Sequence, residues 1–330
     1  MKARAVRFVA PYRVEVGEVP VPAPREGELL VRTEFSGISG GTELLAYRGE
    51  VDPRLPRDET LAALGGTFAY PFVYGYSVVG TVERSAGPLS EGTRVFAFHP
   101  HQDVFVAKAE DTVPLDGVEA RSATLLPLVE TALQVCLDAG PRYADDVVVT
   151  GLGAVGTLTA ALLARTGARL IASEPRTWRR DAARAFGVRA VAPEDLPASV
   201  REATDGRGAS LLVETSGDPK ALADGLPLLS HEGVALVCSW YGTKPVALPL
   251  GAEFHRRRLT IRSSQVSTIP SELAGRWDRT RRREAARALL GELPVSALAT
   301  HEFPFERAAD AYAAIDRGEP GLIHAALRYR

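Results

Sequence analysis

Cysteine, long apolar runs and an excess of either charge are all scarce in this chain of 330 residues. Its two cysteines, Cys136 and Cys238, lie far apart in apolar segments, which excludes a disulfide framework and indicates a cytoplasmic protein. No apolar run is long enough to cross a bilayer, and the N-terminus MKARAVRFVA predicts a strand rather than a signal peptide. The formal net charge of -2 gives no footprint for nucleic acid or an anionic membrane surface. We therefore expect a soluble globular protein, with two domains for this length.

A glycine-rich turn lies in the middle of the sequence, in the stretch VVVTGLGAVG at 147–156. The β-branched residues before the turn predict a buried strand, and the apolar residues 157–164 after it predict a helix. Gly151, Gly153 and Gly156 match the G-x-G-x-x-G pattern of dinucleotide-binding folds. The first glycine permits the sharp turn, the second lets the backbone approach a pyrophosphate, and the third lets the helix pack close to the strand. We predict a bound nicotinamide dinucleotide; the alternative is a turn that only packs.

An acidic residue ends the next predicted strand, 169–173. Glu174 lies about 20 residues after the glycines, where a carboxylate can accept hydrogen bonds from the adenosine ribose hydroxyls. A 2′-phosphate would meet a like charge there, so this residue favours NAD(H) over NADP(H). Arg176, Arg179 and Arg180 leave NADP(H) open, because one of them could pair with a phosphate.

The order of predicted elements indicates an α/β protein. The first part of the chain is mostly strand, including 72–83 and 93–106. Strands and helices then alternate from 147 to 262, which predicts a doubly wound parallel sheet with helices on both faces. An arginine-rich helix, a further helix and a last strand follow, and we expect this tail to rejoin the first domain. The expected division is 1–116, 117–264 and 265–330.

Five stretches together carry a resemblance to a known family: SGISGGTELLAYRG (36–49), YGYSVVGTV (74–82), GLGAVG (151–156), VETSG (213–217) and HEFPFERAADAYAAI (301–315). The chain resembles the medium-chain dehydrogenase/reductase superfamily, which contains the zinc alcohol dehydrogenases, over nearly its whole length. Within that superfamily, GISGGTE is most similar to bacteriochlorophyllide-type hydroxyethyl dehydrogenases. The resemblance implies a Rossmann cofactor domain inserted into a GroES-like, partly open β-barrel catalytic domain, a substrate cleft between them, and a homodimer.

The positions where zinc members of the family hold metal carry poor ligands here. The resemblance places Ser39 (or Gly40), Tyr76 and Pro127 at the catalytic ligand positions, and two cysteines are too few for a structural-zinc lobe. We therefore expect no zinc. A metal held by His99, His101 and Asp103 is conceivable, because two histidines at i and i+2 of a strand point the same way. No further partner is evident, and a polar strand end or a substrate-facing pair is the other interpretation.

Without zinc, protein side chains must stabilise the charge that develops as hydride arrives. Tyr76 replaces a metal ligand, and its protonated phenol can donate to an oxyanion, although a packed aromatic ring is the alternative. The resemblance puts Thr42 at the hydroxyl that relays protons in the zinc enzymes, and Glu43 beside it could orient it. A helix N-cap is the alternative for Thr42, and a structural role is the favoured interpretation of Glu43. His101 is a candidate general acid, because the pKa of histidine can lie near working pH.

The resemblance also assigns cofactor contacts residue by residue. Ala154 and Val155 supply backbone amides of the turn, and Arg179 flanks the adenosine. The remaining residues lie at the carboxyl ends of later strands, where ligands bind in such sheets: Thr215, Ser216, Ser239, Trp240, Ser264 and Gln265.

These features favour a zinc-independent oxidoreductase that transfers hydride between a nicotinamide cofactor and a small-molecule enone or ketone. Loss of the Lewis acid favours reduction of a conjugated C=C, which depends less on direct metal polarisation. One alternative is a secondary-alcohol dehydrogenase of the bacteriochlorophyllide type. Another is a non-catalytic sensor that binds the dinucleotide and has lost the chemistry.

Overall fold

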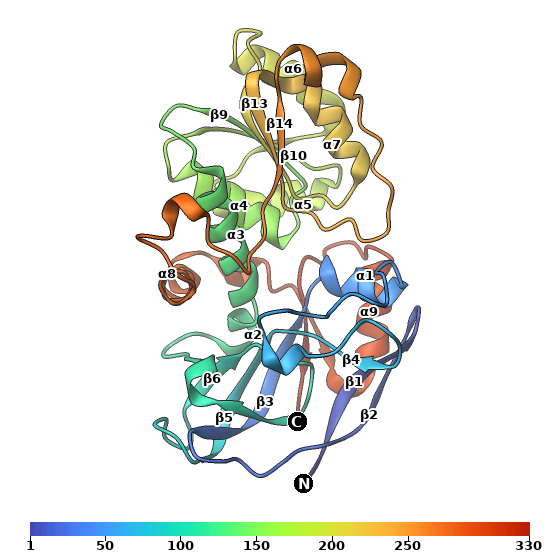
Figure 1. The fold of residues 1–330 in the computed structure, drawn as a ribbon, viewed down its shortest axis with the longest axis vertical. Helices are drawn as coiled ribbons and strands as arrows, with labels where there is room; N and C mark the ends of the chain where they lie inside the picture. The colour runs from blue at the N-terminus through green and yellow to red at the C-terminus, as the bar shows by residue number, and fades with distance from the viewer. The chain divides into compact units, whose positions relative to one another are not determined.

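The computed structural model describes all residues from Met1 to Arg330 (Figure 1). The chain forms two compact units. The first combines residues 1–127 with 298–330, and the second is the continuous segment 128–297. No helix has both the length and the apolar composition that a membrane crossing requires.

The second unit is built on a 6-stranded sheet in which every neighbouring pair is parallel. The strand order is β11-β10-β9-β12-β13-β14, so the order reverses beside β9. This is the arrangement of a doubly wound Rossmann sheet, in which ligands bind where the order reverses. The strands are β9 (Asp146–Thr150), β10 (Arg169–Ser173), β11 (Ala190–Val191), β12 (Ala209–Glu214), β13 (Leu229–Val237) and β14 (Thr260–Ser263).

Helices cover both faces of this sheet because alternate strand residues point to opposite sides. Val147 and Val149 of β9 pack into one core, whereas Val148 between them packs into another. All three valines are fully buried, as expected for a parallel sheet covered on both faces. The helices of this segment are α3 (Leu126–Ala139), α4 (Ala154–Ala164), α5 (Thr177–Ala183), α6 (Leu196–Ala203), α7 (Pro219–Gly225) and α8 (Arg279–Glu292).

The first unit is mainly antiparallel, with a 3-stranded sheet β2-β1-β4 and a 7-stranded sheet around β3. Its strands are β1 (Lys2–Ala10), β2 (Arg13–Pro20), β3 (Glu28–Ile38), β4 (Phe72–Val73), β5 (Val78–Ser85), β6 (Arg94–Ala97), β7 (Val104–Lys108), β8 (Thr112–Pro114), β15 (His301–Pro304) and β16 (Ala325–Arg328). Its helices are α1 (Thr42–Arg48), α2 (Ala120–Ala123) and α9 (Ala308–Asp316). An aromatic core joins the two ends of the chain, because Phe8 of β1 meets Tyr312 of α9 edge to face at 5.3 Å.

Two predicted strands of the first unit are interrupted. The stretch 72–83 breaks into β4 and β5, because Gly75 between them has φ +110°, a conformation outside the strand region. The stretch 93–106 breaks into β6 and β7, so the histidines between them do not lie on a strand. A side chain at position 75 would also collide with His101, since a Cβ there would lie 2.5 Å from its ring. Gly75, between β4 and β5, therefore packs against His101, between β6 and β7.

The compact units divide the chain at places other than the expected 116/117 and 264/265. Residues 265–297, including α8, belong with the second unit. A buried ion pair provides the physical reason, since Arg282 of α8 lies 3.0 Å from Glu130 of α3 and both side chains are 3% exposed. The chain returns to the first unit only from Leu298 onward, through β15, α9 and β16. We call the first unit the β unit and the second the Rossmann unit.

Candidate active site

The glycine-rich turn between β9 and α4 has the geometry that its pattern predicts. Gly151 has φ +86°, and a Cβ on it would lie 2.5 Å from the backbone of Ser216. A Cβ on Gly156 would lie 1.9 Å from the carbonyl oxygen of Gly151, so helix α4 can approach the strand only without a side chain there. Gly153, in contrast, has open space beside it, and the nearest atom is Nη1 of Arg179 at 4.0 Å. The middle glycine is therefore the one that leaves room for a ligand.

Helix α4 begins directly after this open position. Its N-cap residue is Gly153, and no side chain caps the helix there. Ala154 and Val155 are the first helical residues, so their N–H groups belong to the turn that has no intrahelical acceptor. Uncapped amides at the positive end of a helix are suited to bind a phosphate.

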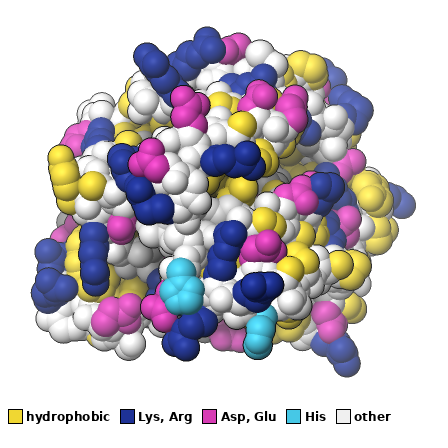
Figure 2. All heavy atoms as spheres, turned by 90° about the horizontal axis from the view of Figure 1, so that it is seen from above, with side chains coloured by type: hydrophobic (Ala, Val, Ile, Leu, Met, Phe, Trp, Pro, Cys, Tyr) yellow, Lys and Arg dark blue, Asp and Glu magenta, His cyan; other side chains and the backbone are white.

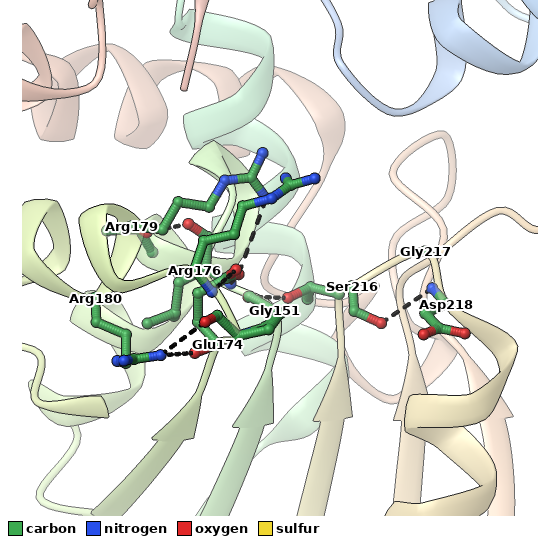
Figure 3. A network of polar contacts seen from close by, with 12 residues as sticks. Gly151, Glu174, Arg176, Arg179, Arg180, Ser216, Gly217 and Asp218 are labelled. Atoms are coloured by element: carbon green, nitrogen blue, oxygen red, sulfur yellow. Dashed lines mark hydrogen bonds and ion pairs between the residues drawn. The ribbon is translucent and has the colours of Figure 1, made fainter. Parts of the chain in front are cut away.

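Glu174 follows β10 and is buried at 2% exposure. Its carboxylate accepts hydrogen bonds from the backbone N–H of Leu152 at 2.8 Å and of Arg176 at 3.0 Å. Figure 3 shows Arg176 and Arg179 extending to one side of this carboxylate and Arg180 turning to the other. Arg180 donates to the carbonyl oxygens of Glu174 and Pro175, which commits its guanidinium to the backbone. Of the three arginines, Arg176 and Arg179 are thus the ones placed beside Glu174 to meet a ligand.

Further predicted cofactor residues follow β12 and β13. Thr215 donates to the carbonyl oxygens of Thr150 and Gly151, which ties it to the glycine-rich turn. Ser239 accepts a hydrogen bond from the N–H of Gly217 at 2.9 Å, and Trp240 beside it is 40% exposed. The carboxyl ends of the central strands thus bring Thr215, Ser216 and Ser239 to one edge of the sheet.

Two predicted contacts after β14 have local partners. The Ser264 hydroxyl donates to Asp138 of α3 at 2.5 Å, and the Gln265 side chain accepts from Ser267 at 2.5 Å. Both side chains therefore hold protein structure in the chain as described, and a role toward the cofactor stays a prediction.

A buried acid at this edge was not predicted. Glu214, the last residue of β12, is 0% exposed and accepts from the Ser216 hydroxyl at 2.5 Å and from the Tyr241 hydroxyl at 2.6 Å. Burial and the negative charge of Glu214 raise the pKa of Tyr241. The signal in the sequence was a charged residue at the end of an apolar strand, within the VETSG stretch.

In the β unit, Tyr76 interacts with Ser39, Thr42 and Glu43. Thr42 and Glu43 were predicted as catalytic residues, and the resemblance puts Ser39 at a zinc-ligand position. Burial and the negative charge of Glu43 raise the pKa of Tyr76 to about 12, against hydrogen bonds from Ser39 and Thr42. The phenol is therefore protonated at neutral pH and can donate a proton. Thr42 is not the N-cap of α1, which is Gly41, so the alternative interpretation of its hydroxyl as a cap is wrong.

Glu43 is the centre of a buried polar cluster. It is 0% exposed and accepts from the Ser39 N–H at 2.9 Å and from the Tyr312 hydroxyl at 2.5 Å. His101, also 0% exposed, lies with Nε2 at 2.8 Å from the same carboxylate. Because both side chains are enclosed, a role of His101 as a general acid stays a prediction. Tyr312 was not predicted as a site residue, because no local pattern relates α9 to α1.

The residues at the family's zinc positions do not fit a zinc ion. Ser39 and Tyr76 are neutral hydroxyl groups, and the side chain of Pro127 has no atom that can bind a metal. No three His, Cys, Asp or Glu side chains of the chain lie together in a way that could hold a metal.

The second metal hypothesis also fails on geometry. His99 stacks on Phe105 with ring centroids 4.1 Å apart, His101 faces Glu43, and Asp103 pairs with Arg4 at 3.0 Å. The interpretation of the histidines as a pair pointing the same way was wrong, because this segment is a bend and not a strand.

Comparisons with known proteins agree with this fold. A family model described as zinc-binding dehydrogenase matches residues 154–281. The chain is 29% identical over 337 residues to 2-desacetyl-2-hydroxyethyl bacteriochlorophyllide A dehydrogenase of Cereibacter sphaeroides, covering 95% of this chain and 94% of that protein. It is 30% identical over 252 residues to L-threonine 3-dehydrogenase of Pyrococcus furiosus, covering 67% and 71%. The solved structure of an alcohol dehydrogenase from Thermotoga maritima has a TM-score of 0.81 at 18% identity and full coverage of both chains, 100% each.

The chain belongs to the medium-chain dehydrogenase/reductase family, of the zinc-type alcohol dehydrogenase kind. It is an oxidoreductase of the alcohol and polyol dehydrogenase type, which removes the non-catalytic sensor from consideration. The family and the glycine-rich turn together support a nicotinamide dinucleotide as the cofactor.

Proposed function

We propose that this protein is a zinc-independent, NAD(H)-preferring reductase that acts on a small-molecule enone or ketone, with Tyr76 as the proton donor. The observation that carries the proposal is the Tyr76 cluster. A protonated phenol is hydrogen-bonded by Ser39 and Thr42. The family resemblance puts this phenol at a position where zinc members hold a metal ligand.

The Tyr76 phenol can stabilise the negative charge that develops on the substrate oxygen. When bound, the nicotinamide ring supplies hydride to the substrate. The phenol donates a hydrogen bond to the oxygen on which negative charge develops, and then its proton. Thr42 and Ser39 hold the phenol oxygen in place by their own hydrogen bonds. Glu43 fixes the loop, since it accepts the N–H of Ser39.

The Rossmann unit offers matching groups for the cofactor. The amides of Ala154 and Val155 and the open space beside Gly153 suit the pyrophosphate, and Glu174 suits the adenosine ribose. Only two of the lone pairs of the Glu174 carboxylate are used by backbone N–H groups, so it can accept further hydrogen bonds. This supports NAD(H) as the preferred cofactor.

The test combines turnover with metal content. The purified protein is assayed for oxidation of NADH and NADPH with a panel of enones and ketones, before and after chelator treatment, and zinc is measured by mass spectrometry. We expect reduction of at least one enone or ketone, with no stoichiometric zinc and no loss of activity in chelator. Zinc near one equivalent per chain, lost together with activity, would overturn zinc independence.

Tyr76→Phe tests the proton donor. Removing one oxyanion donor lowers kcat by about 10²–10³-fold, and the dissociation constant of NADH should not change. Tyr70→Phe is the matched control, because the Tyr70 hydroxyl donates to the carbonyl oxygen of Ala46 in the same unit. Equal kcat values for Tyr76→Phe and the parent would remove Tyr76 from the mechanism.

Oxidation of a secondary alcohol is the second candidate function. The similarity to a bacteriochlorophyllide dehydrogenase over 95% of the chain favours it. The same residues would act in reverse, with Tyr76 accepting the hydroxyl proton. Reduction of NAD⁺ by secondary alcohols, with no oxidation of NADH by enones, would select this alternative.

We also propose a cytoplasmic homodimer. The family resemblance supports the dimer, and β14 is an edge strand of the Rossmann sheet that could pair with a second copy. Two free cysteines support the cytoplasm. A monomeric mass in solution would contradict the dimer.

A further inference from the structure

A continuous line of hydrogen bonds runs outward from Glu43 through the β unit. His101 lies with Nε2 at 2.8 Å from the Glu43 carboxylate and Nδ1 at 2.7 Å from the Ser36 hydroxyl. Ser36 in turn lies 2.9 Å from the Tyr329 hydroxyl. Glu43, His101 and Ser36 are all 0% exposed, so no water competes for these contacts. The four side chains come from α1, the segment before β7, β3 and the segment after β16.

One set of hydrogen-bond directions lets a proton move along this line. In this set the Glu43 carboxylate accepts, and the ring proton of His101 lies on Nε2. Nδ1 of His101 is then an acceptor, and Ser36 must donate to it. The Ser36 oxygen accepts in turn from the Tyr329 hydroxyl. All donors thus point inward to Glu43, and reversing the line moves one proton from Tyr329 to Glu43.

The inner end of this line of hydrogen bonds lies near Tyr76, which gives up a proton. The outer end lies at the surface, where water can supply one. At the inner end, Ser39 links the two groups, with its N–H on Glu43 and its side chain on Tyr76. At the outer end, Tyr329 lines a surface groove of about 450 Å³. Arg32, Glu34, Arg328 and Arg330 also line this groove, and water can enter it.

We propose that Glu43, His101, Ser36 and Tyr329 form a proton relay that neutralises Glu43 when Tyr76 gives its proton to the substrate. The proposal rests on the proposed role of Tyr76. Without the relay, the Tyr76 phenolate would form beside the Glu43 carboxylate, and two anions would share one enclosed site. Repulsion between close like charges in a low-dielectric interior is strong, so a proton on Glu43 favours the step.

The step balances atom by atom. The O–H bond of Tyr76 breaks and the O–H bond of the product forms, with hydride taken from the nicotinamide. The Nε2 proton of His101 passes to Glu43, the Ser36 proton passes to Nδ1 of His101, and the Tyr329 proton passes to Ser36. Tyr329 takes a proton from water in the groove. After the product leaves, Tyr76 takes a proton from water in the vacated substrate site and the relay runs back, so Glu43 returns its proton to the groove. The net result of both stages is the uptake of one proton from solvent for each hydride transferred.

Other titratable groups face the relay and are engaged elsewhere. The Tyr312 hydroxyl of α9 is directed at Glu43, and Nε2 of His324 lies 2.9 Å from the Thr124 hydroxyl. Tyr74 and Tyr76 face Glu43 from the segment after β4. Arg4 and Asp103, which act on Tyr329 from a distance, pair with each other at 3.0 Å. None of these groups provides a second route from Glu43 to the surface groove.

Ser36→Ala and Tyr329→Phe cut the relay without touching the Glu43–His101 contact. In the parent and both variants, we would measure kcat for ketone or enone reduction, its dependence on pH and its solvent deuterium isotope effect. We expect kcat at neutral pH to fall about tenfold or more, with a larger isotope effect and an unchanged KM. Ser122→Ala, a buried serine outside the relay, and Tyr70→Phe are the matched controls and should behave as the parent. Folded relay variants with the kcat and isotope effect of the parent would overturn the proposal.

A second measurement does not depend on turnover. Imidazole nitrogen NMR of the full chain, with His101 assigned by its absence in His101→Gln, reports which nitrogen carries the proton. We expect the proton on Nε2 and a hydrogen-bonded Nδ1 whose resonance moves in Ser36→Ala. A His101 proton on Nδ1 overturns the relay whatever the substrate assay shows. A parent that reduces no enone or ketone overturns the proposed function instead.

Discussion

The two units each contain a buried carboxylate at the centre of their polar groups, and the two carboxylates are held in different ways. Glu174 of the Rossmann unit is bound by backbone N–H groups of Leu152 and Arg176, 22 and 2 residues away in the sequence. Glu43 of the β unit is bound by the Tyr312 hydroxyl, 269 residues away, and faces His101, 58 residues away. The first site is built by the backbone of one β-α-β segment, and the second by side chains that only the complete unit brings together.

This difference has a physical consequence for each site. Backbone N–H groups are fixed by the strand and the turn, so the Glu174 site needs few particular side chains beyond its own. The Glu43 site depends on every partner, because a buried donor without an acceptor costs free energy. On the face drawn in Figure 2, basic and acidic side chains are interspersed.

The largest expected effect is on stability, in Glu43→Ala. The substitution leaves the Ser39 N–H, the Tyr312 hydroxyl and Nε2–H of His101 without an acceptor, all in enclosed positions. We expect the free energy of unfolding to fall by about 3–5 kcal/mol. Glu43→Gln should lose only about 1 kcal/mol, because the Tyr312 hydroxyl and the His101 ring can reorient to an amide. Chemical denaturation followed by far-UV circular dichroism measures both.

Glu174→Ala is the comparison for that experiment. It leaves two backbone N–H groups rather than three donors, so its loss of stability should be smaller than that of Glu43→Ala. A Glu174→Ala loss equal to or larger than the Glu43→Ala loss would break the comparison between a site built by backbone and one built by distant side chains.

The same contrast explains how much the sequence could predict. The geometry of the glycine-rich turn could be predicted, because Gly151, Gly153 and Glu174 lie in one contiguous segment whose spacing carries it, whereas their contacts with a cofactor stay a prediction. In the β unit, Tyr76, Thr42 and Glu43 were predicted through the family resemblance, and the structure brings them together. Tyr312, Ser36 and Tyr329 could not be predicted, because their contacts with Glu43 and His101 depend on how β3, α9 and β16 pack. Arg282 was missed for the same reason, since its partner Glu130 lies 152 residues earlier.

The second prediction concerns acid sensitivity, which should belong to the β unit. Burial lowers the pKa of both His99 and His324 to about 4. Above the unfolded pKa of about 6.5 these histidines are neutral in both states, so their burial costs nothing. As the pH falls from about 6.5 towards 4, the unfolded chain takes up protons that the folded chain does not, and stability is lost. We expect a loss of about 4 kcal/mol between pH 7 and 5 for the two histidines together.

Intrinsic tryptophan fluorescence can show in which of the two units stability is lost. All three tryptophans, Trp178, Trp240 and Trp277, lie in the Rossmann unit. Their fluorescence should therefore report a transition that depends less on pH than the far-UV circular dichroism does. His324→Gln, whose amide can still bond to Thr124, should flatten the pH dependence of the circular dichroism transition. If acid shifted the fluorescence transition alone, the acid-sensitive groups would lie in the Rossmann unit, and this prediction would be wrong.

The smallest expected effect is on cofactor choice, through Glu174 and the arginines beside it. The Glu174 carboxylate favours NADH by its bonds to the ribose hydroxyls and disfavours a 2′-phosphate by charge. Glu174→Ala should therefore change the ratio of the NADH and NADPH dissociation constants by about ten- to hundredfold towards NADPH, or about 1.4–2.8 kcal/mol. Fluorescence titration of both cofactors measures the ratio in the parent and the variant.

Arg176 and Arg179 determine how large the change in cofactor preference is. The guanidinium of Arg179 lies 3.9 Å from the Glu174 carboxylate, and its Nε atom is buried without a hydrogen-bond partner. Once the carboxylate is removed, Arg179 and Arg176 are free to pair with a 2′-phosphate. In the Glu174→Ala background, Arg179→Ala should therefore remove most of the gain for NADPH. Arg180→Ala is the control and should not, because Arg180 already binds the carbonyl oxygens of Glu174 and Pro175. If the parent prefers NADPH, then Arg176 and Arg179 outweigh Glu174 already, and the backbone-held carboxylate does not select the cofactor.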